Sequence, residues 1–173
     1  KLGAVGQHEN TILLFTADNG THPSISSGWN GQQIRGGKGK TTNMGTHVPL
    51  VVSWPEQGAK GIVSNALIDF TDFYATFAEV AGVKLVRGEG DPIDGHSFLA
   101  QIIGEKGTSR DFVFTHYQPY WGTKEASQFV RNQEYKLYQD DRFFNVPNDL
   151  KELSNLTVGE ASNLGELARI KLQ

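Results

Sequence analysis

The sequence predicts an α/β fold that ends in a smaller antiparallel sheet. Two short and nearly continuous apolar runs, residues 11–16 and 48–54, are typical of strands buried on both faces of a central sheet. Beyond about residue 110, four short stretches rich in aromatic and β-branched residues are typical of hairpin strands. The 173 residues suit one compact domain or a large part of one.

The segment between the two apolar runs, residues 18–47, shows no regular apolar period and is expected to form a long loop. It contains seven glycines together with several Ser, Thr and Asn residues. A loop of about thirty residues inside a compact domain is uncommon and usually carries function. The second run includes Pro49 at its start, where a missing backbone N–H is tolerated.

A helix is expected to begin near Thr71 and to end before Gly82, which can take the left-handed conformation of a helix terminus. Apolar residues in this segment follow the i, i+3, i+4, i+7 spacing of one helix face. These residues are Phe70, Phe73, Tyr74, Phe77, Ala78 and Ala81. Residues 97–103 are expected to add one or two further helical turns.

The C-terminal part is expected to be a small antiparallel sheet followed by a helix over residues 159–173. The strands are expected at residues 111–117, 127–131, 134–138 and 142–146, with turns at Asn132-Gln133 and Asp140-Asp141. The chain is therefore predicted to divide into residues 1–108, the α/β part with the long loop, and residues 109–173, the small-sheet subdomain.

Composition excludes several classes of function. The net charge of −3 argues against a nucleic-acid-binding protein that relies on bulk positive charge. The chain has no cysteine, so disulfides, zinc–thiolate sites and thiol nucleophiles are excluded. No apolar run approaches the roughly 20 residues that a helix needs to span a bilayer, so no membrane span is expected.

Asp18 and Asn19 directly follow the first predicted strand. In open α/β sheets, ligands bind at the carboxyl ends of the strands. A carboxylate beside an amide carbonyl offers the hard oxygen ligands that Ca²⁺ and Mg²⁺ prefer. The Asp-Asn-Gly sequence is also common in turns that bind nothing, so these residues alone leave both interpretations open.

The glycine-rich segment of residues 35–42 contains two lysines and can present backbone N–H groups to an anion. It does not match the P-loop of nucleotide-binding proteins, because Ile34 stands where that motif requires its first glycine. A generic anion site and a solvated basic loop are the alternatives. His22 and His47 flank this segment and are candidates for facing a ligand.

Taken together, these segments resemble the sulfatase family in order and spacing. The run Thr-Ile-Leu-Leu-Phe-Thr-Ala-Asp18-Asn-Gly is followed by Arg-Gly-Gly-Lys38-Gly, and then by Gly-Thr-His47-Val-Pro-Leu-Val-Val-Ser-Trp-Pro. The predicted helix, the Asp-Gly-His-Ser stretch at residues 94–97 and the C-terminal hairpin also resemble that family. The similarity covers about residues 10–155.

The resemblance implies the C-terminal part of a sulfatase, whose fold is an alkaline-phosphatase-like α/β sandwich with a small antiparallel sheet. It implies hydrolysis of sulfate esters, with Asp18 and Asn19 as ligands of Ca²⁺, or alternatively Mg²⁺, and with Lys38 holding the sulfate. His47 stands where the family commonly has arginine, and it is either an anion-facing residue or a structural variant. His22 is a further candidate substrate contact. A divalent cation and an ammonium both neutralise charge on a transferring sulfuryl group.

The sequence departs from the family at the nucleophile. Sulfatases use a formylglycine made from the Cys or Ser of a C/S-x-P-x-R motif. This chain has no Cys, and its one Ser-x-Pro, Ser53-Trp-Pro55, lacks the arginine. The formylglycine and the remaining metal ligands are therefore expected in a missing N-terminal part, and the chain alone is expected to be inactive. The alternatives are a phosphodiesterase or phosphonate monoester hydrolase of the same superfamily, or a non-catalytic domain that binds sulfated ligands.

A sulfate ester is the expected substrate, with no nucleic acid as partner. The first strand would leave an apolar edge and face uncovered without its partners from the missing half. Homo-oligomerisation, or association with the N-terminal half, is therefore expected. The family resemblance also implies a periplasmic or secreted protein.

Overall fold

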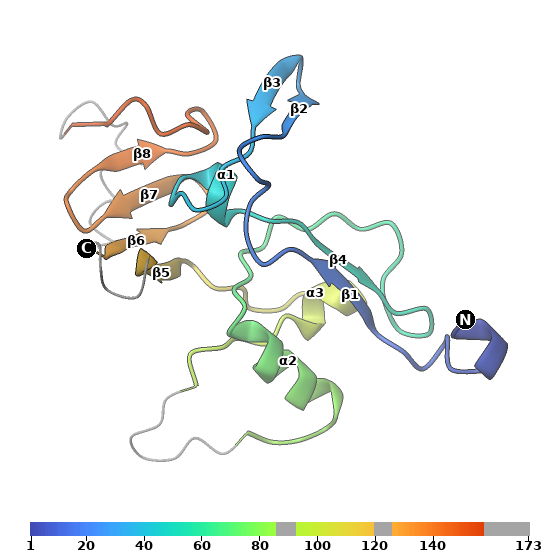
Figure 1. Ribbon diagram of the computed structural model, residues 1–173. Helices are drawn as coiled ribbons and strands as arrows, with labels where there is room; N and C mark the ends of the chain where they lie inside the picture. Colours follow the sequence, from blue (N-terminus) through green and yellow to red (C-terminus); the bar gives the residue numbers. More distant parts are fainter. Residues whose placement is uncertain (86–92, 120–125, 158–173) are drawn as a thin grey trace. The chain divides into compact units, whose positions relative to one another are not determined.

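The structure is a computed structural model that describes residues 1–85, 93–119 and 126–157 (Figure 1). The helix expected over residues 159–173 lies outside these described residues. Within the described part of the chain, no helix is both long enough and apolar enough to cross a bilayer.

The chain divides into two compact units, each built from two separate segments of the sequence. The first unit combines residues 1–15 and 51–113, and the second combines residues 16–50 and 114–173. The glycine-rich segment thus belongs to the same unit as the C-terminal sheet. The division into domains after residue 108 remains a prediction from the sequence.

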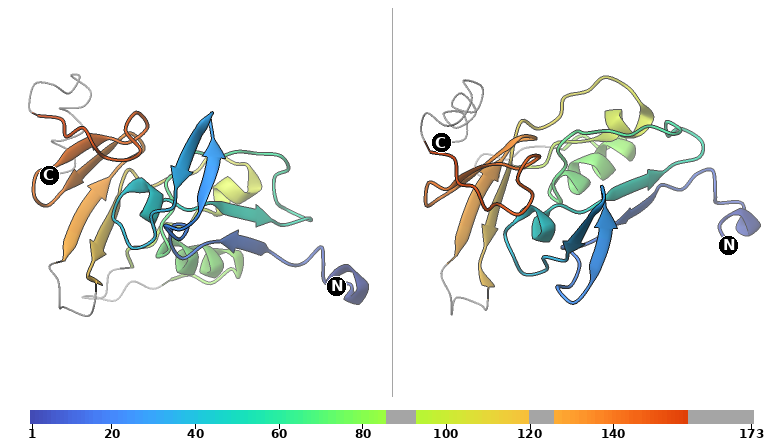
Figure 2. Two further views of the ribbon diagram at one scale, coloured as in Figure 1. Left: turned by 45° about the horizontal axis from the view of Figure 1, so that its top comes forward. Right: turned by 90° about the horizontal axis from the view of Figure 1, so that it is seen from above.

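The two apolar runs form strands β1 (Leu13–Thr16) and β4 (Leu50–Ser53), which pair in a two-stranded sheet (Figure 2). A short 3₁₀ helix, η1 (Gly3–Val5), precedes them. The expectation that both faces of these strands are buried is wrong for the described chain, because Leu13, Phe15 and Val51 are each more than half exposed. Each strand has a single neighbour in the described chain, so outward side chains stay uncovered.

The two predicted helices are confirmed as α2 (Asp72–Val80) and α3 (Leu99–Ile103). Gly82 follows α2 with a φ of 67°, the left-handed conformation that favours glycine. The buried face of α2 differs from the predicted apolar one, since Phe70, Tyr74 and Phe77 are about half exposed or more. The residues that α2 buries are Asp72, Ala75 and Thr76.

Polar contacts explain why this other face of α2 is buried. The Thr76 hydroxyl accepts a hydrogen bond from the backbone N–H of Phe98 at 3.0 Å. The Asp72 carboxylate accepts hydrogen bonds from the backbone N–H groups of Asp69 and His96, each at 2.7 Å, and from the Arg110 guanidinium. Burial alone would raise the pKa of Asp72, but the bonds from Arg110 and the two backbone groups hold it below its usual value.

The segment 18–47 is not the unstructured loop that the sequence predicts. Strands β2 (Ser26–Trp29) and β3 (Gln32–Arg35) form an antiparallel hairpin, and one helical turn, α1 (Asn43–Thr46), follows (Figure 1). The hairpin turns at Asn30 and Gly31, both with positive φ (47° and 73°). Asn-Gly is the preferred sequence for such a two-residue turn, so the local signal was present in the sequence.

The predicted C-terminal sheet is confirmed. Its strands are β5 (Val113–Tyr117), β6 (Ser127–Arg131), β7 (Tyr135–Tyr138) and β8 (Phe143–Asn145), which neighbour one another in that order. β7 pairs antiparallel with both β6 and β8, and all four of its residues are buried. One apolar cluster contains Phe129, Tyr138 and Phe144, and a second contains Tyr135, Leu137 and Phe143.

Candidate functional site

The Asp18-Asn19 pair lies in the turn that follows β1. The Asn19 side-chain amide donates a hydrogen bond to Asp18 Oδ2 at 2.7 Å, and the Asp18 carboxylate is exposed. The turn is fixed to α1 because the Gly20 N–H donates to the Gly45 carbonyl at 3.0 Å. A Cβ on Gly20 would overlap the carbonyl oxygen of Met44, so only glycine permits this close approach.

Lys38 lies on a segment that runs alongside the same turn. Its backbone N–H donates to the Thr21 carbonyl at 3.0 Å, and its side chain is exposed. A Cβ on Gly36 would overlap the Thr21 carbonyl, and one on Gly37 would crowd Met44 of α1. The glycines before Lys38 thus allow the backbone to pass close to both neighbours. The structure therefore brings together the Asp18-Asn19 turn and the Lys38 segment.

The two candidate histidines have different surroundings. His22 is exposed, and its Nδ1 lies 2.8 Å from the Ser24 hydroxyl and accepts the Ser24 backbone N–H at 3.2 Å. Because Nδ1 acts as an acceptor here, Nε2 is the ring nitrogen left to donate. His47 directly follows α1 and donates its backbone N–H to the Asn43 carbonyl at 2.9 Å. Partial burial, and secondarily Arg131, lower the pKa of His47, so its ring is neutral at pH 7.

A groove of about 580 Å³ adjoins these residues within the second unit. Hairpin residues such as Trp29 and Arg35 line it, together with Met44 of α1, His47 and Arg131. The Trp29 side chain is more than half exposed. Arg35 and Arg131 give the groove a positive charge that suits an anionic ligand.

Arg131 is a residue of this groove that the sequence analysis missed. Its Nη1 donates to the Asn43 side-chain oxygen at 2.6 Å, which links β6 to α1. Burial lowers the pKa of Arg131, and the nearby Glu152 opposes that effect. The 88 positions that separate Arg131 from Asn43 leave no local signal for this contact.

Asp18 and Asn19 are the two residues that the sequence predicts as metal ligands. Their carboxylate and amide oxygens are hard donors of the kind that Ca²⁺ and Mg²⁺ prefer, so the pair fits such an ion. Two side chains do not complete a coordination shell of six or more oxygens. Across the described residues, no three His, Asp or Glu side chains gather into a further metal-binding group.

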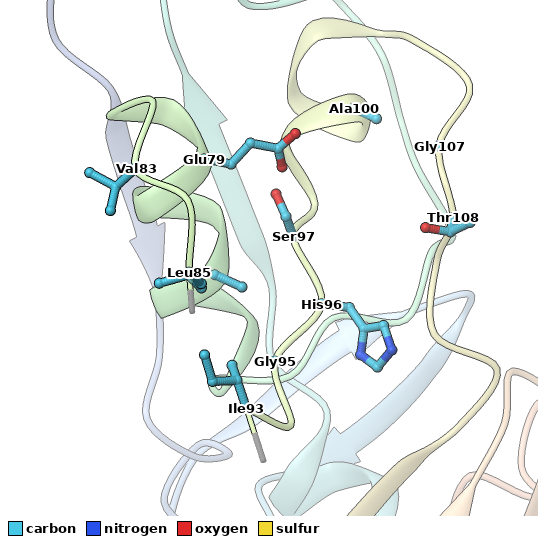
Figure 3. A pocket seen from close by; sticks show the side chains of 11 residues that line it. Glu79, Val83, Leu85, Ile93, Gly95, His96, Ser97, Ala100, Gly107 and Thr108 are labelled. Atoms are coloured by element: carbon cyan, nitrogen blue, oxygen red, sulfur yellow. The ribbon is translucent and has the colours of Figure 1, made fainter. Parts of the chain in front are cut away.

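A second cavity, of about 480 Å³, lies in the first unit between α2 and α3 (Figure 3). The Glu79 carboxylate of α2 and the Ser97 hydroxyl point toward each other across it, and Leu85 and Ile93 line another part (Figure 3). None of the residues predicted to bind metal or sulfate lines this cavity.

A family model described as Sulfatase matches residues 1–83. A protein named Sulfatase from Formosa agariphila is 33% identical over 173 residues, a match that covers 88% of this chain and 30% of that protein. Human Arylsulfatase A is 30% identical over 138 residues, with 79% of this chain and 26% of that protein covered.

Solved sulfatase structures share the fold. The PsFucS1 sulfatase from Pseudoalteromonas sp. superposes with a TM-score of 0.73 at 25% identity, covering 98% of this chain and 37% of that one. A structure of BT4656 with its substrate D-glucosamine-2-N,6-O-disulfate also gives 0.73, at 23% identity, covering 99% of this chain and 35% of that one. These likenesses confirm the predicted fold class. The chain spans about a third of the length of the relatives that it matches.

Proposed function

Because this chain belongs to the sulfatase family, we propose that it is the C-terminal part of a sulfatase and contributes metal and sulfate contacts to the hydrolysis of sulfate esters. The observation that carries the proposal is the juxtaposition of the Asp18-Asn19 turn with the Lys38 segment. Two backbone hydrogen bonds maintain it, from Lys38 to Thr21 and from Gly20 to Gly45.

Each proposed residue has a distinct role. The Asp18 carboxylate and the Asn19 amide oxygen would hold Ca²⁺, or alternatively Mg²⁺. The bound cation would supply Lewis-acid stabilisation of negative charge on the sulfate ester. The Lys38 ammonium would donate hydrogen bonds to the sulfate oxygens and neutralise part of their charge. His47, whose ring is neutral at pH 7, and His22 would each donate a hydrogen bond from a ring N–H.

The nucleophile has to come from outside this chain. No cysteine is present, and the single Ser-x-Pro sequence lacks the arginine of the formylglycine motif. We therefore propose that the rest of a longer parent protein supplies the formylglycine and the other metal ligands. The 173 residues alone would then bind anions without turnover.

Exposed apolar side chains in the first unit support the proposal that a longer parent protein contains further parts of the domain. They are Leu13 and Phe15 of β1 together with Phe70, Tyr74 and Phe77 beside or on α2. Since the chain spans about a third of its relatives, we propose that the rest of the sulfatase domain covers this surface; homo-oligomerisation is the alternative. A periplasmic or secreted location is proposed from the family resemblance.

The test uses the complete protein that contains this chain. Release of 4-nitrophenol from 4-nitrophenyl sulfate and from bis(4-nitrophenyl) phosphate is measured for the wild type, Lys38→Met and Lys60→Met. We expect sulfate-ester hydrolysis that Lys38→Met lowers by about 10²–10³ in kcat/KM, the range for removing one transition-state hydrogen-bond donor. Lys60→Met, at an exposed lysine of the first unit, is expected to change kcat/KM less than threefold.

Two results would contradict the proposal. Hydrolysis of the phosphodiester with no sulfate release would favour the phosphodiesterase alternative. Binding of a sulfated saccharide with no hydrolysis of either ester would favour the non-catalytic alternative.

A further inference from the structure

Lys136 and Glu152 form an ion pair where burial of charge is costly. Lys136 Nζ lies 3.0 Å from Glu152 Oε1, and the two side chains are only 1% and 2% exposed. Lys136 is in the central strand β7, and its ammonium lies 3.8 Å from the centre of the Phe129 ring. A buried ion pair is weak evidence of stabilisation, because a well-packed apolar pair often does as well or better. The pair therefore calls for another explanation.

The remaining bonds of this pair lead to the segment that follows Lys38. The Lys136 ammonium donates to the Thr41 carbonyl. Glu152 Oε1 accepts the backbone N–H of Asn43 at 3.0 Å, and Glu152 Oε2 accepts the Tyr138 hydroxyl at 2.5 Å. Tyr138 Oη also lies 3.2 Å from the Thr41 hydroxyl. Lys136, Tyr138 and Glu152, here called the Lys136 cluster, thus hold Thr41 and Asn43 through backbone and side-chain atoms.

We propose that the Lys136 cluster is a positioning device for the sulfate-contacting segment, which it fixes at Thr41 and Asn43 so that Lys38 keeps its place beside the Asp18-Asn19 turn. The inference rests on the proposed function, because Lys38 is taken there as the sulfate contact. The three cluster residues act through the segment and are positioning residues.

The path from the cluster to Lys38 is short. Only two residues separate Lys38 from Thr41, and the Lys40 N–H donates to the Gly37 carbonyl at 2.9 Å, which closes a tight turn around Lys38. On its other side, Lys38 is fixed to Thr21. Lys38 is therefore held between an anchor at Thr21 and the buried anchor at Thr41.

Two further observations agree with a positioning role. Glu152 has a φ of 54°, a left-handed conformation that is unusual for a residue other than glycine and is kept where the surroundings determine it. Burial lowers the pKa of Lys136 to about 8, while Glu152 opposes that shift and helps to keep the ammonium charged near neutral pH. Burial and the bond to Glu152 raise the pKa of Tyr138, so its hydroxyl stays protonated and donates.

The test replaces the ionic pair with an apolar pair in the complete protein, as the double variant Lys136→Met/Glu152→Leu. Its control is Asp140→Asn, which breaks an exposed ion pair in the same C-terminal region and keeps Arg142, whose guanidinium lies over the Tyr138 ring. Hydrogen exchange of the Lys38 and Lys40 amides reports on the segment without requiring activity. We expect at least tenfold faster exchange at these two amides in the cluster variant and no change in the control.

Kinetics then separate positioning from general stability. The cluster variant is expected to lose about 10- to 100-fold in kcat/KM for 4-nitrophenyl sulfate. In a Lys38→Met background the same two substitutions are expected to change kcat/KM less than threefold, because the residue through which they act is already gone. Unchanged amide exchange, or an equal kinetic loss with and without Lys38, would overturn the inference.

A second variant keeps the test decisive if the double variant does not fold. Tyr138→Phe removes one hydroxyl and retains the ring that packs against Phe129 and Phe144. It is expected to speed exchange at the Lys38 and Lys40 amides by about threefold or more, and identical exchange would count against the inference. If the wild type hydrolyses no sulfate ester, the proposed function fails, and the exchange measurement still decides whether the cluster holds the segment.

Discussion

Replacing Asp72 with Asn should destabilise the packing of α2 against the chain that leads into α3. The Asp72 side chain is 2% exposed and its partner Arg110 is 11% exposed. The two carboxylate oxygens accept four hydrogen bonds, two from backbone N–H groups and two from the guanidinium. An asparagine has one acceptor oxygen, and its amide group would present hydrogens to groups that are themselves donors.

The burial of Asp72 and Arg110 sets the size of the expected loss of stability. Removing one member of a buried ion pair costs about 3–5 kcal/mol, because the other charge is left buried without a counter-charge. We expect a loss in this range for Asp72→Asn. The exposed pair of Asp140 and Arg142 is the control, with side chains 61% and 46% exposed. Asp140→Asn should cost no more than about 1 kcal/mol.

Native-state hydrogen exchange in the complete protein measures this effect locally. The amides of His96 and Asp69 donate to Asp72, so their opening free energies should fall in Asp72→Asn and stay unchanged in Asp140→Asn. The pKa of Asp72 is lowered in the folded state, so its contribution is present above the unfolded value of 3.8 and is lost as pH falls through the folded-state pKa. The difference in opening free energy between the wild type and Asp72→Asn should therefore become smaller at acidic pH. Equal losses of opening free energy in the two variants would show that burial of the Asp72–Arg110 pair does not set the cost.

Three further outcomes test the candidate site in the complete protein. Gly45→Ala should lower kcat/KM at least tenfold, because a Cβ there would overlap backbone carbonyl oxygens, whereas Gly28→Ala has room and should change it less than threefold. Chelation should abolish sulfate-ester hydrolysis and added Ca²⁺ should restore it, with Asp18→Ala needing at least tenfold more Ca²⁺ for half-maximal rate; full activity in chelator would contradict the metal assignment. The lowered pKa of His47 keeps its ring neutral at pH 7–8, so His47→Gln should leave the slope of log kcat/KM against pH unchanged in that window; a slope lost in the variant would show that His47 titrates there.

The elements with strong local patterns were predictable from the sequence. The helix begins and ends where Thr71 and Gly82 indicate, and the four C-terminal strands lie where aromatic and β-branched residues concentrate. The buried face of α2 was not predictable from its apolar spacing. Asp72 and Thr76 are buried because groups more than twenty residues away bond to them, and such partners leave no periodic signal.

In the candidate site, too, some features were predictable from the sequence and others were not. The order of Asp18, Asn19 and Lys38 along the chain was enough to predict a shared site by family resemblance, and their roles there remain predictions. Lys136 gave no such signal, because a lysine between two apolar residues of a strand, here Tyr135 and Leu137, is typical of a solvent-exposed face. It is buried because β7 has a neighbour on each side and the Thr41 segment covers its face, which only the tertiary structure shows.

The most direct test of the account is the intact mass and full sequence of the natural parent protein. Since the chain spans about a third of its relatives, the account predicts a parent about three times as long, with a C/S-x-P-x-R motif and an aspartate pair upstream of these residues. Mass spectrometry of that motif should find formylglycine at its first position. A natural protein limited to these 173 residues would contradict the claim that they complete a sulfatase active site.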